Sequence, residues 1–401
     1  MSAPSDERRH SLAPIGAALA LIVIFVVVLS IPLGVASNLG LTQAQLTGWL
    51  VALYGVPGVL SVVLAWRYRQ PLLLTSNIFV LIFVASLGSE LSWAELVGAS
   101  MLAGAAVSVL GLLGITDRLA GWLPASIVFG VLAGAVLPFV VDLFDALGGE
   151  PGVVGATLVA YLLGRRFLEP RVPAVLPAVV VGLVGAWLVG GLAAPPARIV
   201  FPLAELTMPV FSLPAVLTAT PVMVVLITLQ ANAPSVVFLR TQGYDPPDRT
   251  IGLISGGGTL LASIFGPLGI SLSLPATALT AGPDAGPQAI RHRAALLAGA
   301  AAVVFALLAG YAAELETLIL RPLLVAVIGL AVVGVFAGAL KQVVSGPLVI
   351  GPLFSFGIAL SDLSLFGLGP FFWALIVGLG VSRLVEHAAW AELQARDPSE
   401  A

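Results

Sequence analysis

The sequence predicts an all-α polytopic membrane protein with 14 transmembrane segments. Of the 401 residues, 59% are hydrophobic and 9% are charged, whereas soluble domains carry about 25% charged residues. The apolar residues form runs of about 20, the length that spans a bilayer as a helix. Its 44 Gly and 29 Pro lie inside these runs rather than in polar tracts, which excludes a disordered chain.

The apolar segments follow one another along the whole chain. They cover residues 12–31, 46–66, 71–87, 93–114, 121–144, 152–164, 173–192, 214–234, 250–266, 268–282, 294–313, 322–340, 345–361 and 365–384. The first segment follows Arg8, Arg9 and His10 and could be a signal peptide. However, it exceeds the roughly 7–15 apolar residues of a signal core and many similar runs follow it. We therefore assign it as the first transmembrane helix.

Basic residues gather on one side of the predicted topology. If the N-terminus is cytoplasmic and the segments alternate, 15 of the 17 Lys and Arg residues fall on the cytoplasmic side. The positive-inside rule requires such a distribution. Arg198 and Arg321 are the exceptions, and Glu90 and Asp362 are among the acidic residues at the outer ends. Both termini are therefore predicted to be cytoplasmic, in a bacterial-type inner membrane.

A proline-rich connection over residues 193–213 separates seven segments from the next seven. Seven is an odd number, so the second half must enter the membrane in the opposite orientation to the first. The topology thus allows a 7+7 inverted repeat, an arrangement common in transporters.

The third and tenth segments occupy equivalent places in the two halves, and both look interrupted. Each starts as a short extended stretch after a proline, Pro71 or Pro267. The third then offers Thr75, Ser76 and Asn77 as helix N-caps. In the tenth, Ser271 and Ser273 alternate with apolar residues as in a strand, and Pro275 suits a first helical turn.

These patterns predict a short strand followed by a half-helix in each of the two segments. Extended backbone at membrane depth is tolerated where it is buried in protein or lines a cavity. Two half-helices that start near the midplane would point free N–H groups and positive dipole ends at one place. An anion could bind there without Arg or Lys. The hydroxyls of Ser271, Ser273 and Thr277 would either contribute to this site or satisfy local backbone groups.

Two amide side chains, Gln230 and Asn232, stand in the apolar eighth segment. Such groups commonly hydrogen-bond between membrane helices, but they can also face a substrate. They are two residues apart, about 200° around an ideal helix, so both can face one ligand only where the helix is broken. Pro234 could break it. We expect Gln230 to face the ligand and leave Asn232 open between the two roles.

Composition excludes several other functions. Without Cys there can be no disulfide, thiolate metal site or Cys nucleophile. His10, His292 and His387 all fall in predicted cytoplasmic segments, and almost no acid lies within a segment. We therefore expect no metal, no cofactor and no enzymatic activity. The net charge of −3 without a basic block makes nucleic acid an unsuitable partner.

The eighth segment and the loop after it carry a family resemblance. Gln230-Ala-Asn232, followed by Phe238-Leu-Arg-Thr-Gln-Gly-Tyr-Asp-Pro-Pro247, resembles the benzoate–proton symporter (BenE-like) family, and residues 124–139 are also similar. The resemblance implies the seven-plus-seven fold of nucleobase and sulfate-type anion transporters. In that fold a core domain moves against a gate domain, and two gate domains can form a homodimer.

Carried onto this chain, the resemblance implies boundaries for each domain. The core would comprise residues 11–114 and 214–313, and the gate residues 121–192 and 322–384. The substrate would lie between the two half-helices, at Asn77, Gln230, Ser273, Thr277 and their neighbours. Nucleobase carriers typically have acidic residues in the eighth and tenth segments, and this chain has none there.

We therefore expect a secondary transporter that imports a small organic anion, most favourably an aromatic carboxylate such as benzoate, with a proton. The ring would pack on side chains such as Phe79. Because an anion and a proton together make a neutral acid, coupling needs no dedicated carboxylate. The alternatives are a nucleobase or inorganic-anion carrier, or an anion channel, on the same fold. A membrane enzyme would need a catalytic constellation that the sequence lacks.

Overall fold

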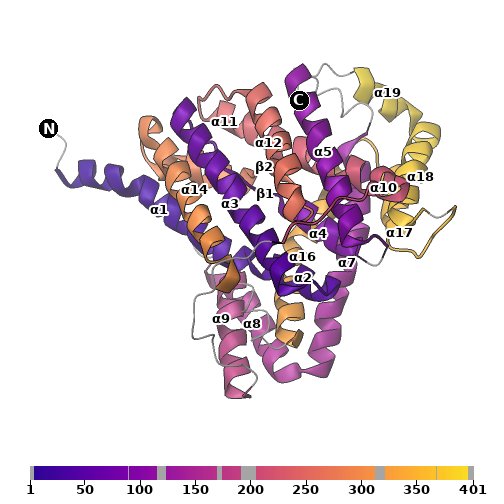
Figure 1. Cartoon of the computed structure of the whole chain (residues 1–401), viewed down its shortest axis with the longest axis horizontal. Coiled ribbons are helices and arrows are strands. Elements are labelled where there is room, and N and C mark those ends of the chain that lie inside the picture. Colours follow the sequence, from indigo (N-terminus) through magenta and orange to yellow (C-terminus); the bar gives the residue numbers. More distant parts are fainter. Residues whose placement is uncertain are drawn as a thin grey trace.

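The computed structural model describes residues 4–88, 90–114, 123–168, 174–190, 205–311, 321–366 and 368–395. It is mostly helical, with one two-stranded sheet near the centre of the molecule (Figure 1). Residues 193–204 of the predicted connection lie outside this part of the chain, as does Arg198.

The helices fall into two series separated by this connection. The first series is α1 (Pro4–Val28), α2 (Ser30–Leu39), α3 (Gln43–Tyr68), α4 (Ile78–Ser86), α5 (Trp93–Leu113), α7 (Ala125–Gly149), α8 (Pro151–Phe167) and α9 (Val175–Leu188). The second is α10 (Leu213–Val225), a π-helix (Leu226–Asn232), α11 (Ala233–Thr241), α12 (Asp248–Ala262), α13 (Leu274–Ala281), α14 (His292–Leu307), α16 (Arg321–Ser345), α17 (Ile350–Ala359), α18 (Pro370–Val385) and α19 (His387–Ala395). Every predicted segment contains at least part of a helix.

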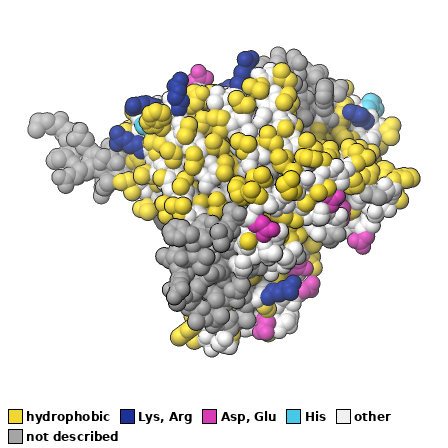
Figure 2. Space-filling model, in the orientation of Figure 1, with side chains coloured by type: hydrophobic (Ala, Val, Ile, Leu, Met, Phe, Trp, Pro, Cys, Tyr) yellow, Lys and Arg dark blue, Asp and Glu magenta, His cyan; other side chains and the backbone are white. Residues whose placement is uncertain are grey.

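Within the described residues, six helices are long and apolar enough to cross a membrane, or seven if the sharply bent pair α18–α19 counts as one span. The six run over Gln43–Tyr68, Trp93–Leu113, Ala125–Gly149, Leu213–Thr241, Gln288–Leu307 and Arg321–Ser345. Hydrophobic side chains cover the middle of one face, and most visible Lys and Arg side chains lie along its upper edge (Figure 2). A large apolar outer surface of this kind is typical of a protein that contacts lipid.

Small residues let several helix pairs pack closely. A Cβ atom on Gly104 of α5 would lie 2.5 Å from the Leu260 nitrogen of α12, and one on Gly256 would lie 2.3 Å from the Ser108 nitrogen. Gly58 of α3 similarly meets the carbonyl oxygen of Gly299 on α14. Elsewhere, α16 and α17 pack on α7, and α8 packs on α9. Close backbone approach through small residues is typical of membrane helix pairs.

The N-terminal region differs from the sequence expectation. We predicted one span over residues 12–31, but α1 ends at Val28 and a separate helix, α2, continues from Ser30 to Leu39. Gly34 allows α2 to pack on Ile328 of α16, because a Cβ atom there would overlap the Ile328 side chain. Gly40, with a φ of 62°, then ends α2 in the left-handed conformation that glycine adopts without strain.

Candidate functional site

The two interrupted segments meet as an antiparallel pair of strands. β1 (Leu74–Ser76) pairs with β2 (Ile270–Leu272), and Thr75 stands opposite Ser271. Beyond the strands, the Asn77 nitrogen donates to the Gly269 carbonyl oxygen at 2.7 Å. The predicted strand and half-helix are thus present in both segments, α4 following β1 and α13 following β2. The strands pair with one another, so their backbone groups are satisfied inside the protein.

Hydroxyl groups on two long helices hold the strands. Ser61 of α3 accepts a hydrogen bond from the Leu74 nitrogen at 2.8 Å and donates to the Leu74 carbonyl oxygen at 3.0 Å. Thr259 of α12 accepts one from the Ile270 nitrogen at 2.8 Å. Neither Ser61 nor Thr259 was singled out from the sequence. The signal available for both was a hydroxyl residue inside an apolar run.

Asn77 connects three segments at the start of α4. Its Oδ1 accepts hydrogen bonds from the nitrogens of Phe79 and Val80, at 3.0 and 3.2 Å. Its Nδ2 donates to the Leu226 carbonyl oxygen at 2.9 Å and to the Ser271 hydroxyl at 3.2 Å. The expectation of free N–H groups here is therefore wrong for Phe79 and Val80. Asn is among the best N-cap residues, and its amide oxygen takes these two donors itself.

The start of α13, in contrast, has no side chain that caps its N–H groups. Ser273 occupies the N-cap position but its side chain makes no capping hydrogen bond. Pro275 in the first turn has no N–H group, and the Thr277 nitrogen bonds to the Ser273 carbonyl oxygen. The Thr277 hydroxyl is buried and has no hydrogen-bond partner. A buried hydroxyl without a partner costs stability, so such a group calls for a functional explanation.

The eighth predicted segment changes helix type at its amide residues. It widens into a π-helix over Leu226–Asn232, and the Ala233 nitrogen bonds five residues back to Thr228. Pro234 follows and cannot donate a hydrogen bond to the preceding turn, which explains the local rearrangement. Single π-helical turns are rare and often lie at functional sites.

The two amide side chains in this π-helix have different surroundings. Asn232 is buried; its Oδ1 accepts from the Leu272 nitrogen at 2.8 Å and its Nδ2 donates to the Ser255 hydroxyl at 3.2 Å. It therefore anchors β2. The Gln230 Oε1 atom is also buried, but it has no hydrogen-bond partner.

The remaining predicted residues lie on the same strands and helix starts. Ser76 donates to the Leu53 carbonyl oxygen, Thr75 and Phe79 are half-buried, and Ser271 is buried. All nine predicted residues thus belong to the β1–α4 junction, the π-helix or the β2–α13 junction, and the π-helix contacts both β2 and α4. Residues 74–86, 226–232 and 270–281 contain no Asp, Glu, His, Lys or Arg. A ligand here would meet only dipoles, hydroxyls, amides and apolar groups.

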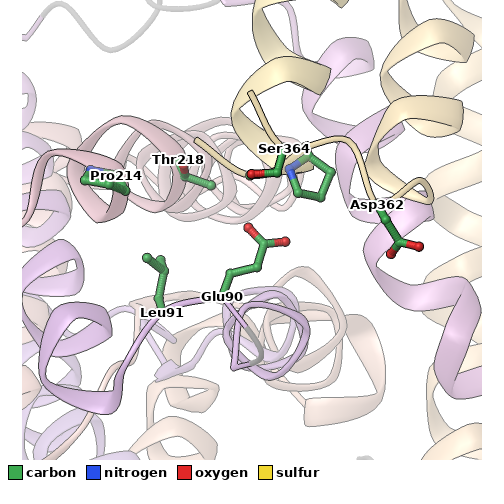
Figure 3. Close-up of a pocket in the computed structure, with 8 residues that line it drawn as sticks. Glu90, Leu91, Pro214, Thr218, Asp362 and Ser364 are labelled. Atoms are coloured by element: carbon green, nitrogen blue, oxygen red, sulfur yellow. The ribbon is translucent and has the colours of Figure 1, made fainter. Parts of the chain in front are cut away.

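A pocket of about 310 Å³ lies elsewhere, at the end of α4 remote from Asn77 (Figure 3). None of the nine predicted residues lines it. Glu90 does, and sequence reasoning used Glu90 only as a marker of the outer side. Among the described residues, no group of three or more His, Asp or Glu side chains could hold a metal ion.

Two broken helices that meet inside a helical membrane protein are a feature common in transporters. This chain belongs to the benzoate membrane transport protein family, whose sequence model matches residues 10–384. The family consists of transporters, so the protein is a membrane transporter and not an enzyme.

Two relatives cover most of the chain. Inner membrane protein YdcO of Escherichia coli is 30% identical over 350 residues, which is 84% of this chain and 87% of the relative. The benzoate membrane transport protein of Acinetobacter baylyi is 26% identical over 347 residues, or 86% and 87% of the two chains. The first relative is named as an inner membrane protein and the second as a membrane transport protein.

Solved structures share the fold at low sequence identity. The transmembrane domain of the cyanobacterial bicarbonate transporter BicA is 16% identical, with a TM-score of 0.54 over 95% of this chain and 97% of that one. SLC26A9 is 15% identical, with a TM-score of 0.61 over 94% of this chain and 66% of that one.

Proposed function

We propose that this protein moves a small organic anion, most favourably benzoate or a related aromatic carboxylate, together with a proton across the inner membrane by alternating access. One observation carries the proposal. In a network where Asn77 and Asn232 are bonded at both ends, the Gln230 Oε1 and Thr277 Oγ1 atoms are buried without partners. The family and the Acinetobacter baylyi relative support the choice of an aromatic carboxylate.

The two unpartnered groups suit a carboxylic acid. An acid O–H group can donate to Gln230 Oε1, and the Thr277 hydroxyl can donate to the acid carbonyl oxygen. The start of α13 adds a positive dipole end for any negative charge on the ligand. Ser273 and Thr75 would line the same site and Phe79 would contact the ring. Ser76, Asn77, Asn232 and Ser271 would hold the segments in place.

We also propose the complete 14-span topology, with both termini in the cytoplasm, and the inverted repeat. Helix packing supports the repeat because contacts occur in equivalent pairs. The pair α3–α14 corresponds to α12–α5, and α8–α9 corresponds to α17–α18. The hydrogen bond from Leu74 to Ser61 likewise corresponds to that from Ile270 to Thr259.

The proposed domains follow from the same packing. The core would comprise residues 11–114 and 214–313, and the gate residues 121–192 and 322–384. In support, α5 and α12 pack together, as do α3 and α14, while α7 packs on α16 and α17. Alternating access would then be a movement of the core past the gate, and a dimer would form through the gate.

The proposal is tested by uptake into vesicles that contain the purified protein. We expect saturable uptake of labelled benzoate, competition by related aromatic acids, and faster uptake when the outside is acidic. If the rate of uptake does not change with an imposed pH gradient, uptake is not coupled to a proton and that part of the proposal is wrong. Flux that neither saturates nor shows counterflow would instead indicate a channel.

A bicarbonate carrier is the second candidate, because the bicarbonate transporter BicA shares the fold. The same vesicles separate the two functions. We expect benzoate uptake to persist in excess bicarbonate, sulfate and uracil. Loss of benzoate uptake in bicarbonate, with bicarbonate itself accumulated, would favour the second candidate.

A further inference from the structure

The pocket at Glu90 lies where three segments meet. Glu90 and Leu91 belong to the connection between α4 and α5, and Pro214 and Thr218 belong to α10. The third side is the chain that enters α18, with Asp362, Ser364, Gly369 and Pro370. In terms of the proposed domains, the first two segments belong to the core and the third to the gate.

Glu90 reaches across this junction. In Figure 3 its side chain points across the pocket toward Ser364. A Cβ atom on Gly369 would lie 1.8 Å from Glu90 Oε2 and 2.7 Å from its carboxyl carbon. The carboxyl group therefore rests directly on Gly369, the N-cap residue of α18. Any side chain larger than that of glycine would exclude the carboxyl group from this place.

Glu90 is exposed to the pocket, so water can deliver a proton to it. At the same time, the segments around it displace much of its hydration. This desolvation raises the pKa of the Glu90 carboxyl to about 7. Glu90 lies in the connection between α4 and α5 and outside the membrane-spanning segments.

Among the described residues that line the pocket, the other ionisable group is Asp362, on the α18 side. In Figure 3 its side chain lies to the right of Glu90, and its carboxyl group points away from Glu90. Leu91, Pro214, Thr218, Ser364 and Pro370 carry no charge. No lining residue is basic, so none compensates an ionised Glu90 when the segments come together.

We propose that Glu90 is a proton-binding site that controls whether the entrance to α18 closes onto the α4–α5 connection. Protonated Glu90 permits the closed arrangement, and ionised Glu90 opposes it. The proton comes from water on this face and returns to it, so the reaction is carboxylate plus hydronium giving carboxylic acid plus water. The proposal rests on the proposed alternating-access transport, because it makes one of the two closures dependent on pH.

The direction follows from desolvation. Closing removes water from the carboxyl group, which penalises the charged form and favours the neutral form. A group with a pKa of 7 changes from about 90% protonated at pH 6 to about 10% at pH 8. Low pH on this face therefore favours the closed arrangement and high pH favours its opening.

The absence of cysteine makes a direct test simple. Ser364→Cys introduces a single thiol across the pocket from Glu90. Its rate of reaction with a membrane-impermeant maleimide is measured at pH 6 and pH 8, with Glu90 intact and in a Glu90→Gln background. At each pH the labelling rate with Glu90 intact is divided by the rate in the Glu90→Gln background. This ratio removes the ordinary pH dependence of the reaction between the thiol and the maleimide.

We expect this ratio to be about 1 at pH 6 and to rise several-fold at pH 8, because the protonated fraction falls about ninefold. The negative charge of an ionised Glu90 would disfavour the nearby thiolate and so slow labelling at pH 8. Repulsion between the carboxylate and the thiolate therefore cannot produce the expected rise in the ratio. The matched control is Asp362→Asn, which removes the other carboxylate and should leave the ratio unchanged. A ratio that stays constant from pH 6 to pH 8 would overturn the proposal.

Transport supplies an independent readout. With equal pH on both sides of the vesicle, we expect Glu90→Gln to make benzoate uptake clearly less dependent on pH between 6 and 8, and the pH dependence that is left comes from the co-transported proton. If uptake by the unchanged protein is present and Glu90→Gln keeps the full pH dependence, the role of Glu90 is wrong and the proposed function stands. If no benzoate is taken up but the labelling ratio rises as expected, the substrate proposal fails and the pH-dependent closure stands.

Discussion

Asn232 and Gln230 show how two similar side chains in one π-helix take different roles. Both ends of the Asn232 amide bond to the protein and hold β2, whereas the Gln230 oxygen is buried without a partner. A protein tolerates an unsatisfied buried oxygen where a ligand completes the hydrogen bond. This contrast leads to opposite predictions for stability and transport.

We expect Gln230→Leu to reduce benzoate uptake at least about tenfold and to leave the apparent melting temperature in detergent nearly unchanged. The oxygen it removes makes no hydrogen bond in the protein, but it would make one with the substrate. Uptake in vesicles and thermal unfolding of the same preparation provide the two measurements.

The matched variant is Asn232→Leu, which has a different expected effect. It leaves the buried Leu272 N–H group without an acceptor, at a cost of about 1–3 kcal/mol in stability. We therefore expect a clearly lower melting temperature. Equal destabilisation by the two substitutions would contradict the assigned roles.

At the scale of elements, α17 depends on a carboxylate from another helix. Glu386, at the end of α18, accepts hydrogen bonds from the nitrogens of Val349, Ile350 and Gly351 at 2.6, 2.8 and 3.0 Å. It also accepts one from the Ser382 hydroxyl at 3.0 Å. Burial alone would raise the pKa of Glu386, but these hydrogen bonds outweigh it and hold the pKa below its usual value. The start of α17 thus has its capping group 35 residues along the chain.

We expect Glu386→Ala to destabilise the protein by about 1 kcal/mol, a typical value for the loss of an N-cap. Because the folded-state pKa is lowered, the contribution is complete above the ordinary Glu pKa of about 4.5 and is lost as the pH falls through the folded value. Thermal unfolding of both proteins is measured from pH 7 to pH 3. The difference in stability between Glu386→Ala and the unchanged protein should decrease toward zero as the pH falls. A difference that is constant with pH would argue against the ionised cap.

Helix packing provides the next prediction. Gly256→Ala places a methyl group 2.3 Å from the Ser108 nitrogen, whereas Gly257→Ala meets only the Ser108 hydroxyl, at 4.0 Å. We expect the first substitution to lower stability by about 1–3 kcal/mol because α5 and α12 must separate. The second should be neutral or slightly stabilising, since Ala favours helix more than Gly. Thermal unfolding of the two variants checks this, and similar losses would show that α5 and α12 do not pack as described.

For the whole molecule, the direction of insertion remains a prediction that a single thiol can test. Ser361 lies next to the pocket residue Asp362, and Thr241 lies at the end of α11 beside Arg240. On intact cells we expect an impermeant maleimide to label Ser361→Cys but not Thr241→Cys. Opening the cells should make both thiols reactive. The reverse pattern would place both termini outside the cytoplasm.

The apolar segments, the two interrupted segments and the irregular helix around Gln230 could be predicted from the sequence alone. Period-two alternation at Ser271 and Ser273, and N-cap residues at Asn77, are local signals that depend on a few neighbouring residues. The same holds for Pro234, whose missing N–H group accounts for the change of helix type at Gln230. The family resemblance in residues 230–247 was also local, and the family match over residues 10–384 confirmed it.

Which polar groups are satisfied was decided only by the tertiary structure. The Asn77 side chain accepts hydrogen bonds from the first N–H groups of α4, whereas the N-cap side chain of α13 accepts none. Asn232 accepts a hydrogen bond from β2, whereas the Gln230 oxygen has no partner. Glu386 caps a helix 35 residues away, and Glu90 meets Gly369 across an interface. Hydrogen bonds and desolvation act over a few ångströms in space, so their partners come from segments far apart in the chain. Hydrophobic length and helix capping depend on adjacent residues, and for that reason the sequence by itself determined the membrane class and the broken helices.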